Sequence, residues 1–164
     1  MIDAHTPFVT RAYELALKSY TEGGCPIGSV IVRDGAIIGE GHNQRIQQGD
    51  PIAHGEMDAL RNAGRQTHYR DTTLYTSLSP CMMCAGTIVQ FGIPRVVVGD
   101  VANAASDETI RFMRAKGVEV VVLDPQTSAA ARACVELVAT FRREKPEQWL
   151  EDWGGGLNPA LTAR

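Results

Sequence analysis

The order of apolar and polar residues predicts a helix and then a hairpin in the first third of the chain. Apolar positions at helical spacing predict the helix, which ends at Gly23-Gly24. A β-rich run over Ile27–Val32 predicts a strand, Asp34-Gly35 a tight turn, and Ala36–Gly39 the antiparallel partner. The apolar face of the helix consists of Phe8, Ala12, Leu15, Ala16 and Tyr20.

The rest of the chain alternates between helical and strand patterns. The expected elements are a helix from Asp50-Pro51 to Gly64, a strand Thr72–Thr76, a helix from Pro80 to Phe91-Gly92, a strand Arg95–Val98, a helix Asp107–Lys116, a strand Glu119–Leu123, a helix Ser128–Arg143 and a short helix opened by Pro146. Strands joined by a crossover helix run parallel. We therefore expect an α/β fold of three layers, α/β/α, with a single mixed five-stranded sheet and helices on both faces.

Length and charge narrow the function classes. At 164 residues the chain predicts a single domain over 1–153, and Gly154-Gly155-Gly156 begins a loose tail over 154–164. The net charge is −3, and Lys and Arg form no run. Nucleic-acid-binding surfaces are basic, so the composition argues against such a partner and favours a small neutral substrate.

The expected location is the cytoplasm. No apolar run is long enough to span a membrane, and residues 1–5 lack the basic and apolar regions of a signal peptide. The chain has four cysteines, and we assign two of them to a metal rather than to a disulfide scaffold. This usage indicates a reducing compartment.

Two half-motifs carry the candidate chemistry. One is His54-Gly55-Glu56 and the other is Pro80-Cys81-Met82-Met83-Cys84. One histidine and two cysteines are the soft ligands that zinc prefers, and three protein ligands leave the fourth tetrahedral position for a water. The order H-x-E and then P-C-x-x-C is the signature of zinc-dependent deaminases. We expect one Zn²⁺ per chain, bound by His54, Cys81 and Cys84.

The spacing separates the metal ligands from a proton carrier. If Pro80 opens a helix, Cys81 and Cys84 share one face of its first turn. Glu56 stands two residues from His54 and cannot easily join it on the metal, so Glu56 is the candidate general acid/base. The alternatives are a redox dithiol and a closed structural zinc site. The latter needs a fourth ligand, for which the candidates are Cys25, Cys134, His5, His42 and His68, none at a spacing that pairs with either half-motif.

Over Glu22 to Trp153 the sequence resembles the cytidine/deoxycytidylate deaminase superfamily, and more closely its fungal-type cytosine deaminases. The likeness rests on Glu22-Gly23-Gly24, Pro26-Ile27-Gly28, Gly41-His42-Asn43, His54-Gly55-Glu56, Asp71-Thr72-Thr73-Leu74-Tyr75-Thr76, Leu78-Ser79-Pro80-Cys81, Gly92-Ile93-Pro94-Arg95 and Trp149-Leu150-Glu151-Asp152. It implies the cytidine-deaminase-like fold, a homodimer, and zinc-dependent hydrolytic deamination of a free nucleobase. Zinc would lower the pKa of a water to about 7, and Glu56 would move the protons.

The same resemblance implies a set of base contacts. The expected contacts are Asn43, Gly55, Ser79, Asp152, Trp149 and Ile27. The indole of Trp149 would cover the base. The chain departs from the fungal enzymes after the fourth strand, where their clamping aromatic residue matches Ala104. Ala104 would widen the pocket toward free guanine, aminated triazines or modified pyrimidines. A tRNA-adenosine deaminase and a non-catalytic zinc module are the alternatives from other classes.

Overall fold

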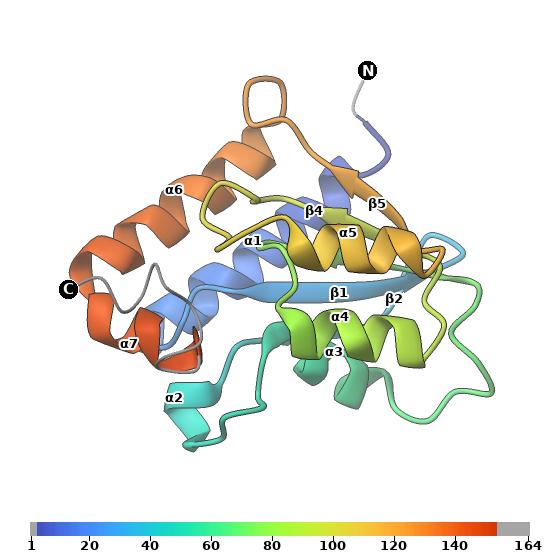
Figure 1. Ribbon diagram of the computed structural model, residues 1–164, viewed down its shortest axis with the longest axis horizontal. Helices are drawn as coiled ribbons and strands as arrows, with labels where there is room; N and C mark the ends of the chain where they lie inside the picture. Colours follow the sequence, from blue (N-terminus) through green and yellow to red (C-terminus); the bar gives the residue numbers. More distant parts are fainter. Residues whose placement is uncertain (1–2, 154–164) are drawn as a thin grey trace.

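The computed structural model describes residues 3–153 (Figure 1), so the tail expected over 154–164 lies outside the described residues. A five-stranded sheet in the order β2-β1-β3-β4-β5 forms the centre. β1 pairs antiparallel with β2 and β3, whereas β3–β4 and β4–β5 are parallel. The predicted mixed sheet is therefore confirmed. The strands are β1 (Gly28–Arg33), β2 (Ala36–His42), β3 (Thr72–Thr76), β4 (Arg95–Val98) and β5 (Glu119–Val122).

The hairpin between β1 and β2 forms at the predicted turn. Asp34 has φ 50° and Gly35 has φ 76°, the positive values that a two-residue hairpin loop requires. β2 continues past its predicted end at Gly39 because Gly41 and His42 still pair with β1. This longer strand delivers Asn43 directly from the sheet.

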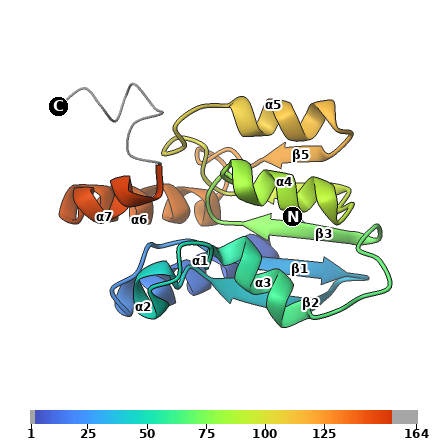
Figure 2. The ribbon, with the colours of Figure 1, turned by 60° about the horizontal axis from the view of Figure 1, so that its bottom comes forward.

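Helices cover both faces of the sheet, which confirms the three layers. Figure 2 shows α3, α4 and α5 on one face, with α3 over β1 and β2. α1 and α6 pack against each other and enclose the core of the other face. The helices are α1 (Thr6–Thr21), α2 (Arg45–Gln48), α3 (Gly55–Ala63), α4 (Met82–Gln90), α5 (Glu108–Ala115), α6 (Ala129–Glu144) and α7 (Pro146–Leu150), followed by the 3₁₀ helix η1 (Glu151–Trp153).

The two faces have separate cores, and a third cluster lies at one end. Side chains such as Ile31, Leu74 and Val96 pack under α3, α4 and α5, and Val30 and Val97 pack under α1 and α6. Successive strand residues point to opposite faces, which explains this division. The third cluster joins Cys25, Ile27, Leu78, Val138, Phe141 and Trp149. It therefore connects the start of β1 to α6 and α7.

Two glycines let α3 lie directly on β2. A Cβ atom at Gly39 or Gly41 would overlap backbone atoms of Ala59 in the middle of α3. Only glycine permits so close an approach. The position of α3, which carries His54 and Glu56 at its start, is thus fixed by the sheet.

The helix predicted from Asp50-Pro51 begins only at Gly55, and this boundary was wrong. Asp50 instead closes a local turn, because its side chain accepts a hydrogen bond from the Ile52 N–H at 3.0 Å. Ala53 accepts from the Gln44 N–H at 2.9 Å, which keeps the following residue extended. The short helix α2, which the pattern did not predict, fills the space between β2 and this turn.

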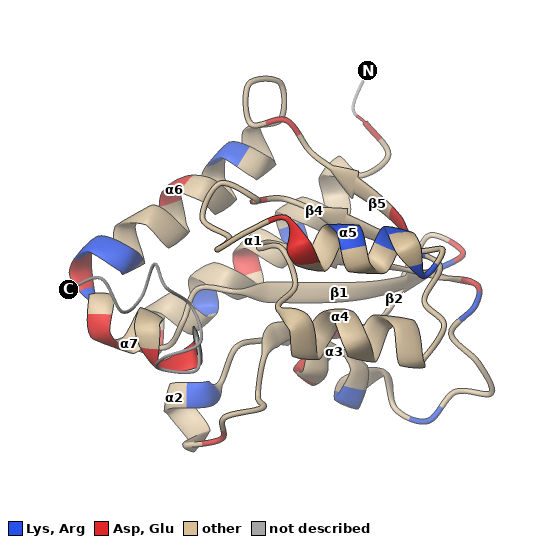
Figure 3. Ribbon diagram, viewed as in Figure 1, with Lys and Arg blue, Asp and Glu red and all other residues tan. Residues whose placement is uncertain are grey.

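Charged residues are interspersed over the described part of the chain (Figure 3), and α5 and α6 each carry both signs. The surface thus agrees with the absence of a Lys/Arg run in the sequence. Among the described residues, no helix is long and apolar enough to cross a membrane.

Candidate metal centre and active site

Two helix N-termini meet at the end of the sheet. His54 is the N-cap of α3 and Cys81 is the N-cap of α4, each with extended backbone angles. Cys84 follows in the first turn of α4. The helix predicted from Pro80 begins at Met82, so Cys81 stands just outside the helix and turns its sulfur toward Cys84. Helix N-termini carry partial positive charge, which favours thiolate.

The donor atoms of His54, Cys81 and Cys84 form a compact cluster, all within 4.8 Å of one another. His54 Nδ1 lies 3.5 Å from Cys81 Sγ and 3.6 Å from Cys84 Sγ. Zn–N and Zn–S bonds of about 2.0–2.3 Å at tetrahedral angles place nitrogen and sulfur about 3.5 Å apart. The observed separations therefore fit a zinc ion bound by these three residues.

Hydrogen bonds and burial shift the pKa values of all three donor side chains. Hydrogen bonds from Cys84 and His54 lower the pKa of Cys81 to about 4. Burial opposes charge on His54, but hydrogen bonds to Asp152 and Cys81 raise its pKa to about 10. The hydrogen bond to Cys81 and burial raise the pKa of Cys84. Zinc binds the deprotonated forms of these donors, so its binding would release their protons.

Glu56 lies beside the cluster without belonging to it. Its side chain is buried, and burial raises the pKa of its carboxyl group. Thr76 Oγ1 donates to Glu56 Oε1 at 3.2 Å, and Cys84 Sγ lies 3.4 Å from Oε2. A fixed carboxyl group whose pKa is raised by burial is suited to take up and release protons.

A cavity opens in front of these groups. Of the expected base contacts, Ile27, Ser79, Trp149 and Asp152 all line this cavity. Asp152 Oδ1 lies 3.0 Å from His54 Nε2, so the ring can donate there and turn Nδ1 toward the sulfurs. The complete lining is Cys25, Ile27, His54, Glu56, Leu78, Ser79, Cys81, Trp149 and Asp152.

Asn43 is buried next to β1, and one polar atom of its side chain lacks a hydrogen-bond partner among the described residues. Its Oδ1 accepts from the Arg45 N–H at 3.1 Å, while Nδ2 has no partner among the described residues. The Oγ of Ser79 is likewise buried without a hydrogen-bond partner. Buried polar groups are nearly always paired, so such unpaired atoms are suited to bind a ligand. Ser79 lines the cavity, whereas Asn43 and Gly55 are not among its lining residues. Gly55, the first residue of α3, lies against Ile27.

The structure does not bring Ala104 to this cavity, contrary to the expectation from the loop. Ala104 lines a separate surface cavity with Val101, Ile110 and Val122. Its neighbour Asn103 turns inward instead and donates to Asp100 Oδ2 at 2.7 Å. This hydrogen bond closes a tight turn in the loop after β4, and Ala104 follows on its outer side in the separate cavity.

Sequence reasoning missed four residues around the site. Cys25 and Leu78 line the cavity; Cys25 stands between two of the motifs that carried the family resemblance, and Leu78 begins another. The guanidinium of Arg142 lies 5.5 Å from the ring centroid of Trp149 and donates to Asn103 Oδ1 at 3.0 Å. Arg45 contacts the segment that carries Asp152. The hydrogen bonds from Arg45 to Glu151 and from Arg142 to Asn103 span 106 and 39 residues of sequence, so no local pattern marks them.

No fourth His, Cys, Asp or Glu joins the cluster in the part of the chain that the structure describes. Cys25 lines the cavity but is not a member of the donor set. A closed structural zinc site requires four protein ligands. The donor set therefore matches a catalytic site.

Comparisons with known proteins agree with this geometry. The sequence is 48% identical over 146 residues to the cytosine deaminase of Candida albicans, covering 87% of this chain and 92% of that protein. It is 38% identical over 143 residues to the tRNA-specific adenosine deaminase of Haemophilus influenzae, covering 84% and 82%. A protein solved in complex with 2,6-diaminopurine shares the fold, with a TM-score of 0.72, 19% identity and coverage of 88% and 84%.

Residues 2–100 match the family described as the cytidine and deoxycytidylate deaminase zinc-binding region. This match includes His54, Glu56, Cys81 and Cys84, the residues that converge in the structure. The chain therefore belongs to the cytidine and deoxycytidylate deaminase zinc-binding family.

Proposed function

We propose that this protein is a zinc-dependent hydrolytic deaminase of a free nucleobase, with cytosine or a related amino-azine ring as substrate. The observation that carries the proposal is the three-donor cluster of His54, Cys81 and Cys84 with the buried Glu56 beside it. The similarity to a cytosine deaminase supports the choice of base. The cofactor is one Zn²⁺ per chain, which supplies Lewis-acid activation of a water when bound.

The residues of the chain have distinct roles in this reaction. Glu56 takes up a proton of the attacking water as the new C–O bond forms and gives it to the ring nitrogen. It then carries the second proton, from the new hydroxyl group, to the departing amine, so that ammonia leaves as the C–N bond breaks. Asn43 Nδ2 donates to a base oxygen, and the Asp152 carboxylate accepts from the exocyclic amine. Ile27 and Trp149 enclose the ring and exclude water, which strengthens these polar contacts.

Ammonia release from cytosine, guanine, adenine and aminated triazines tests the proposal, together with metal analysis of the purified protein. We expect one zinc per chain and the highest kcat/KM for a one-ring base. A protein with bound zinc but no activity on any of these substrates would contradict it.

The second candidate function is tRNA-adenosine deamination, because a relative of 38% identity is a tRNA-specific adenosine deaminase. The net charge of −3 and the interspersed surface charges favour a small substrate instead. Inosine formation in a tRNA transcript, assayed beside the free bases, separates the two functions. Higher kcat/KM on the transcript than on every free base would favour the second candidate.

We also propose a homodimer formed through the outer face of α3 and α4. This face has a groove whose lining combines Met57, Leu60, Val89 and Phe91 with polar and basic side chains such as Arg65, and Phe91 is 47% exposed. Exposed apolar side chains rimmed by polar ones mark interfaces between proteins. Light scattering of the wild type and of Phe91→Asp tests it, and we expect the variant to shift toward monomer. A monomeric wild type would contradict it.

The cytoplasm is the proposed location. All four cysteines are free thiols, and two of them are the proposed zinc ligands. Free thiols of this kind persist in a reducing compartment.

A further inference from the structure

A short helix and the last described segment are joined by one buried arginine. α2 and α7 lie side by side at one end of the molecule (Figure 1), although about 100 residues separate them. Arg45, on α2, donates from Nη1 to Glu151 Oε2 at 2.7 Å and from Nη2 to the Gln148 carbonyl at 2.8 Å. Its side chain is only 9% exposed, so the guanidinium is held in place rather than solvated.

The segment that Arg45 holds carries two cavity residues. Gln148 and Glu151 flank Trp149 and Asp152 in α7 and η1. A helix of five residues followed by one 3₁₀ turn is too short to be stable by itself. Its position over the cavity therefore depends on contacts with the rest of the fold. Arg45 supplies two of these contacts, an ion pair with Glu151 and a hydrogen bond to the Gln148 carbonyl.

The carboxylate of Asp152 lies between Arg45 and His54. Asp152 Oδ1 is 3.0 Å from His54 Nε2 and 3.7 Å from Arg45 Nε. Arg45 Nε is buried and makes no hydrogen bond to the described residues. The positive charge of Arg45 thus helps to hold the Asp152 carboxylate in place. The hydrogen bond between Asp152 and His54 is kept, because Arg45 Nε does not compete for it.

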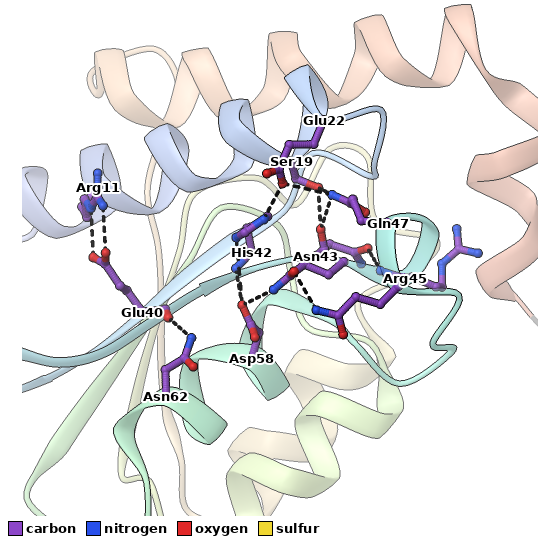
Figure 4. A network of polar contacts seen from close by, with 12 residues as sticks. Arg11, Ser19, Glu22, Glu40, His42, Asn43, Arg45, Gln47, Asp58 and Asn62 are labelled. Carbon is purple, nitrogen blue, oxygen red and sulfur yellow. Dashed lines mark hydrogen bonds and ion pairs between the residues drawn. The ribbon is translucent and has the colours of Figure 1, made fainter.

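Arg45 also contacts Asn43, another of the proposed base contacts, through its main chain. Its N–H donates to Asn43 Oδ1, so that Nδ2 is the atom of this side chain left without a partner among the described residues. Figure 4 shows Asn43 and Arg45 in one polar network, where the Asn43 carbonyl accepts from Ser19 Oγ at 2.6 Å and from Gln47 Nε2 at 3.1 Å. Two hydrogen bonds therefore hold the Asn43 main chain in place, and the Arg45 side chain extends from this network to α7.

We propose that Arg45 is a positioning residue that holds the Trp149–Asp152 segment over the base and links it to Asn43. The inference rests on the proposed function for the identity of the ligand, but the linkage itself concerns the free protein. Arg45 is itself neither a member of the donor cluster nor a residue of the cavity lining. It acts through the residues that it holds.

Hydrogen exchange of the zinc-loaded protein tests the linkage without any substrate. In Arg45→Met, backbone amides of residues 146–153 should exchange about tenfold faster or more, while those of β1 and β3 keep their wild-type rates. Arg11→Met is the matched control, because Arg11 also pairs with two carboxylates, Glu14 and Glu40, but far from the cavity. Unchanged exchange over 146–153 in Arg45→Met, or equal acceleration in the control, would overturn the proposal.

Glu151→Gln keeps the test decisive if Arg45→Met does not fold. The Glu151 side chain is 55% exposed and does not line the cavity, so its loss should leave the core intact. We expect a smaller acceleration over 146–153, and no further acceleration when the two substitutions are combined, because both break the same contact. Wild-type exchange in Glu151→Gln, or additive effects in the double variant, would count against the linkage.

Kinetics distinguish positioning from general stability. In Arg45→Met we expect KM for the base to rise about tenfold or more and kcat to fall less, with zinc still at one per chain. Arg11→Met should keep the wild-type KM. An unchanged KM in Arg45→Met would show that the segment does not position the base. A wild type that deaminates no base would refute the proposed function instead, and the exchange measurements would still decide the linkage.

Discussion

His54 Nε2 lies 3.0 Å from Asp152 Oδ1, across 98 residues of sequence. Asp152 thereby fixes the ring orientation that turns His54 Nδ1 toward both cysteine sulfurs. The same carboxylate lines the cavity where the base is proposed to bind. Metal affinity and base binding are therefore coupled through one side chain.

Asp152→Ala should weaken both properties at once. Loss of the acceptor for the His54 ring should reduce zinc affinity by about 10–100-fold. Competition with a metal chelator of known affinity measures this effect. Glu147→Ala, an exposed carboxylate in the same segment, is the control and should retain wild-type affinity. Equal zinc affinity in all three proteins would show that Asp152 does not support the metal ligand.

Glu56→Gln should keep the metal and lose turnover. Glutamine has the shape of glutamate and can still accept from Thr76, but it cannot carry protons. General acid/base catalysis contributes about 10²–10⁴-fold, so kcat should fall by about that factor. Ammonia release and zinc content are measured together, with the exposed Glu136→Gln as control. A variant with full kcat would place the proton transfer on another group.

Base selectivity should depend on Ile27 and not on Ala104. Ile27 lines the cavity, whereas Ala104 lines a separate one. Ile27→Ala should raise KM for cytosine about fivefold or more, since loss of even one methylene contact in an apolar pocket costs about 1–3 kcal/mol. Ala104→Phe should change neither KM nor the order of preferred bases. Exclusion of larger bases by Ala104→Phe would restore the role that the sequence comparison gave to this position.

Glu40→Gln should lower stability at neutral pH more than at acid pH. The hydrogen bonds from Arg11, 2.8 and 2.9 Å long, hold the pKa of Glu40 below its usual value. This contribution is present above the unfolded-state pKa of about 4.3 and is lost as the pH falls through the lower folded-state pKa. Because both side chains are about 40% exposed, we expect no more than about 1 kcal/mol at pH 7.

Thermal denaturation of Glu40→Gln and wild type at pH 7 and near pH 3 measures this effect. About 1 kcal/mol corresponds to roughly 2–4 °C in Tm for a chain of this size. The difference between the two proteins should shrink at the lower pH. An equal difference at both values would show that the ion pair is not its source.

The sequence by itself determined the strands of the sheet, the order of strands and helices along the chain, and the three proposed metal ligands. Alternating and helical patterns are local properties, so every strand was predicted, although β2 extends beyond its predicted end at Gly39, and Asp34-Gly35 marked the hairpin. The signature spacing identified His54, Cys81 and Cys84 because the chemistry of zinc restricts which residues can hold it. Helix starts were less certain, as at Gly55, because Asp50 and Pro51 are equally suited to a turn.

The tertiary structure alone decided which distant residues meet at the cavity. Arg45 and Asp152 come together because the Arg45 side chain reaches from α2 to Gln148 and Glu151, and Ala104 lies in a separate cavity. Such contacts depend on how whole elements pack, and neither periodicity nor spacing in one segment records them. The three ligands follow from a motif, whereas the shape of the space in front of them follows from the fold.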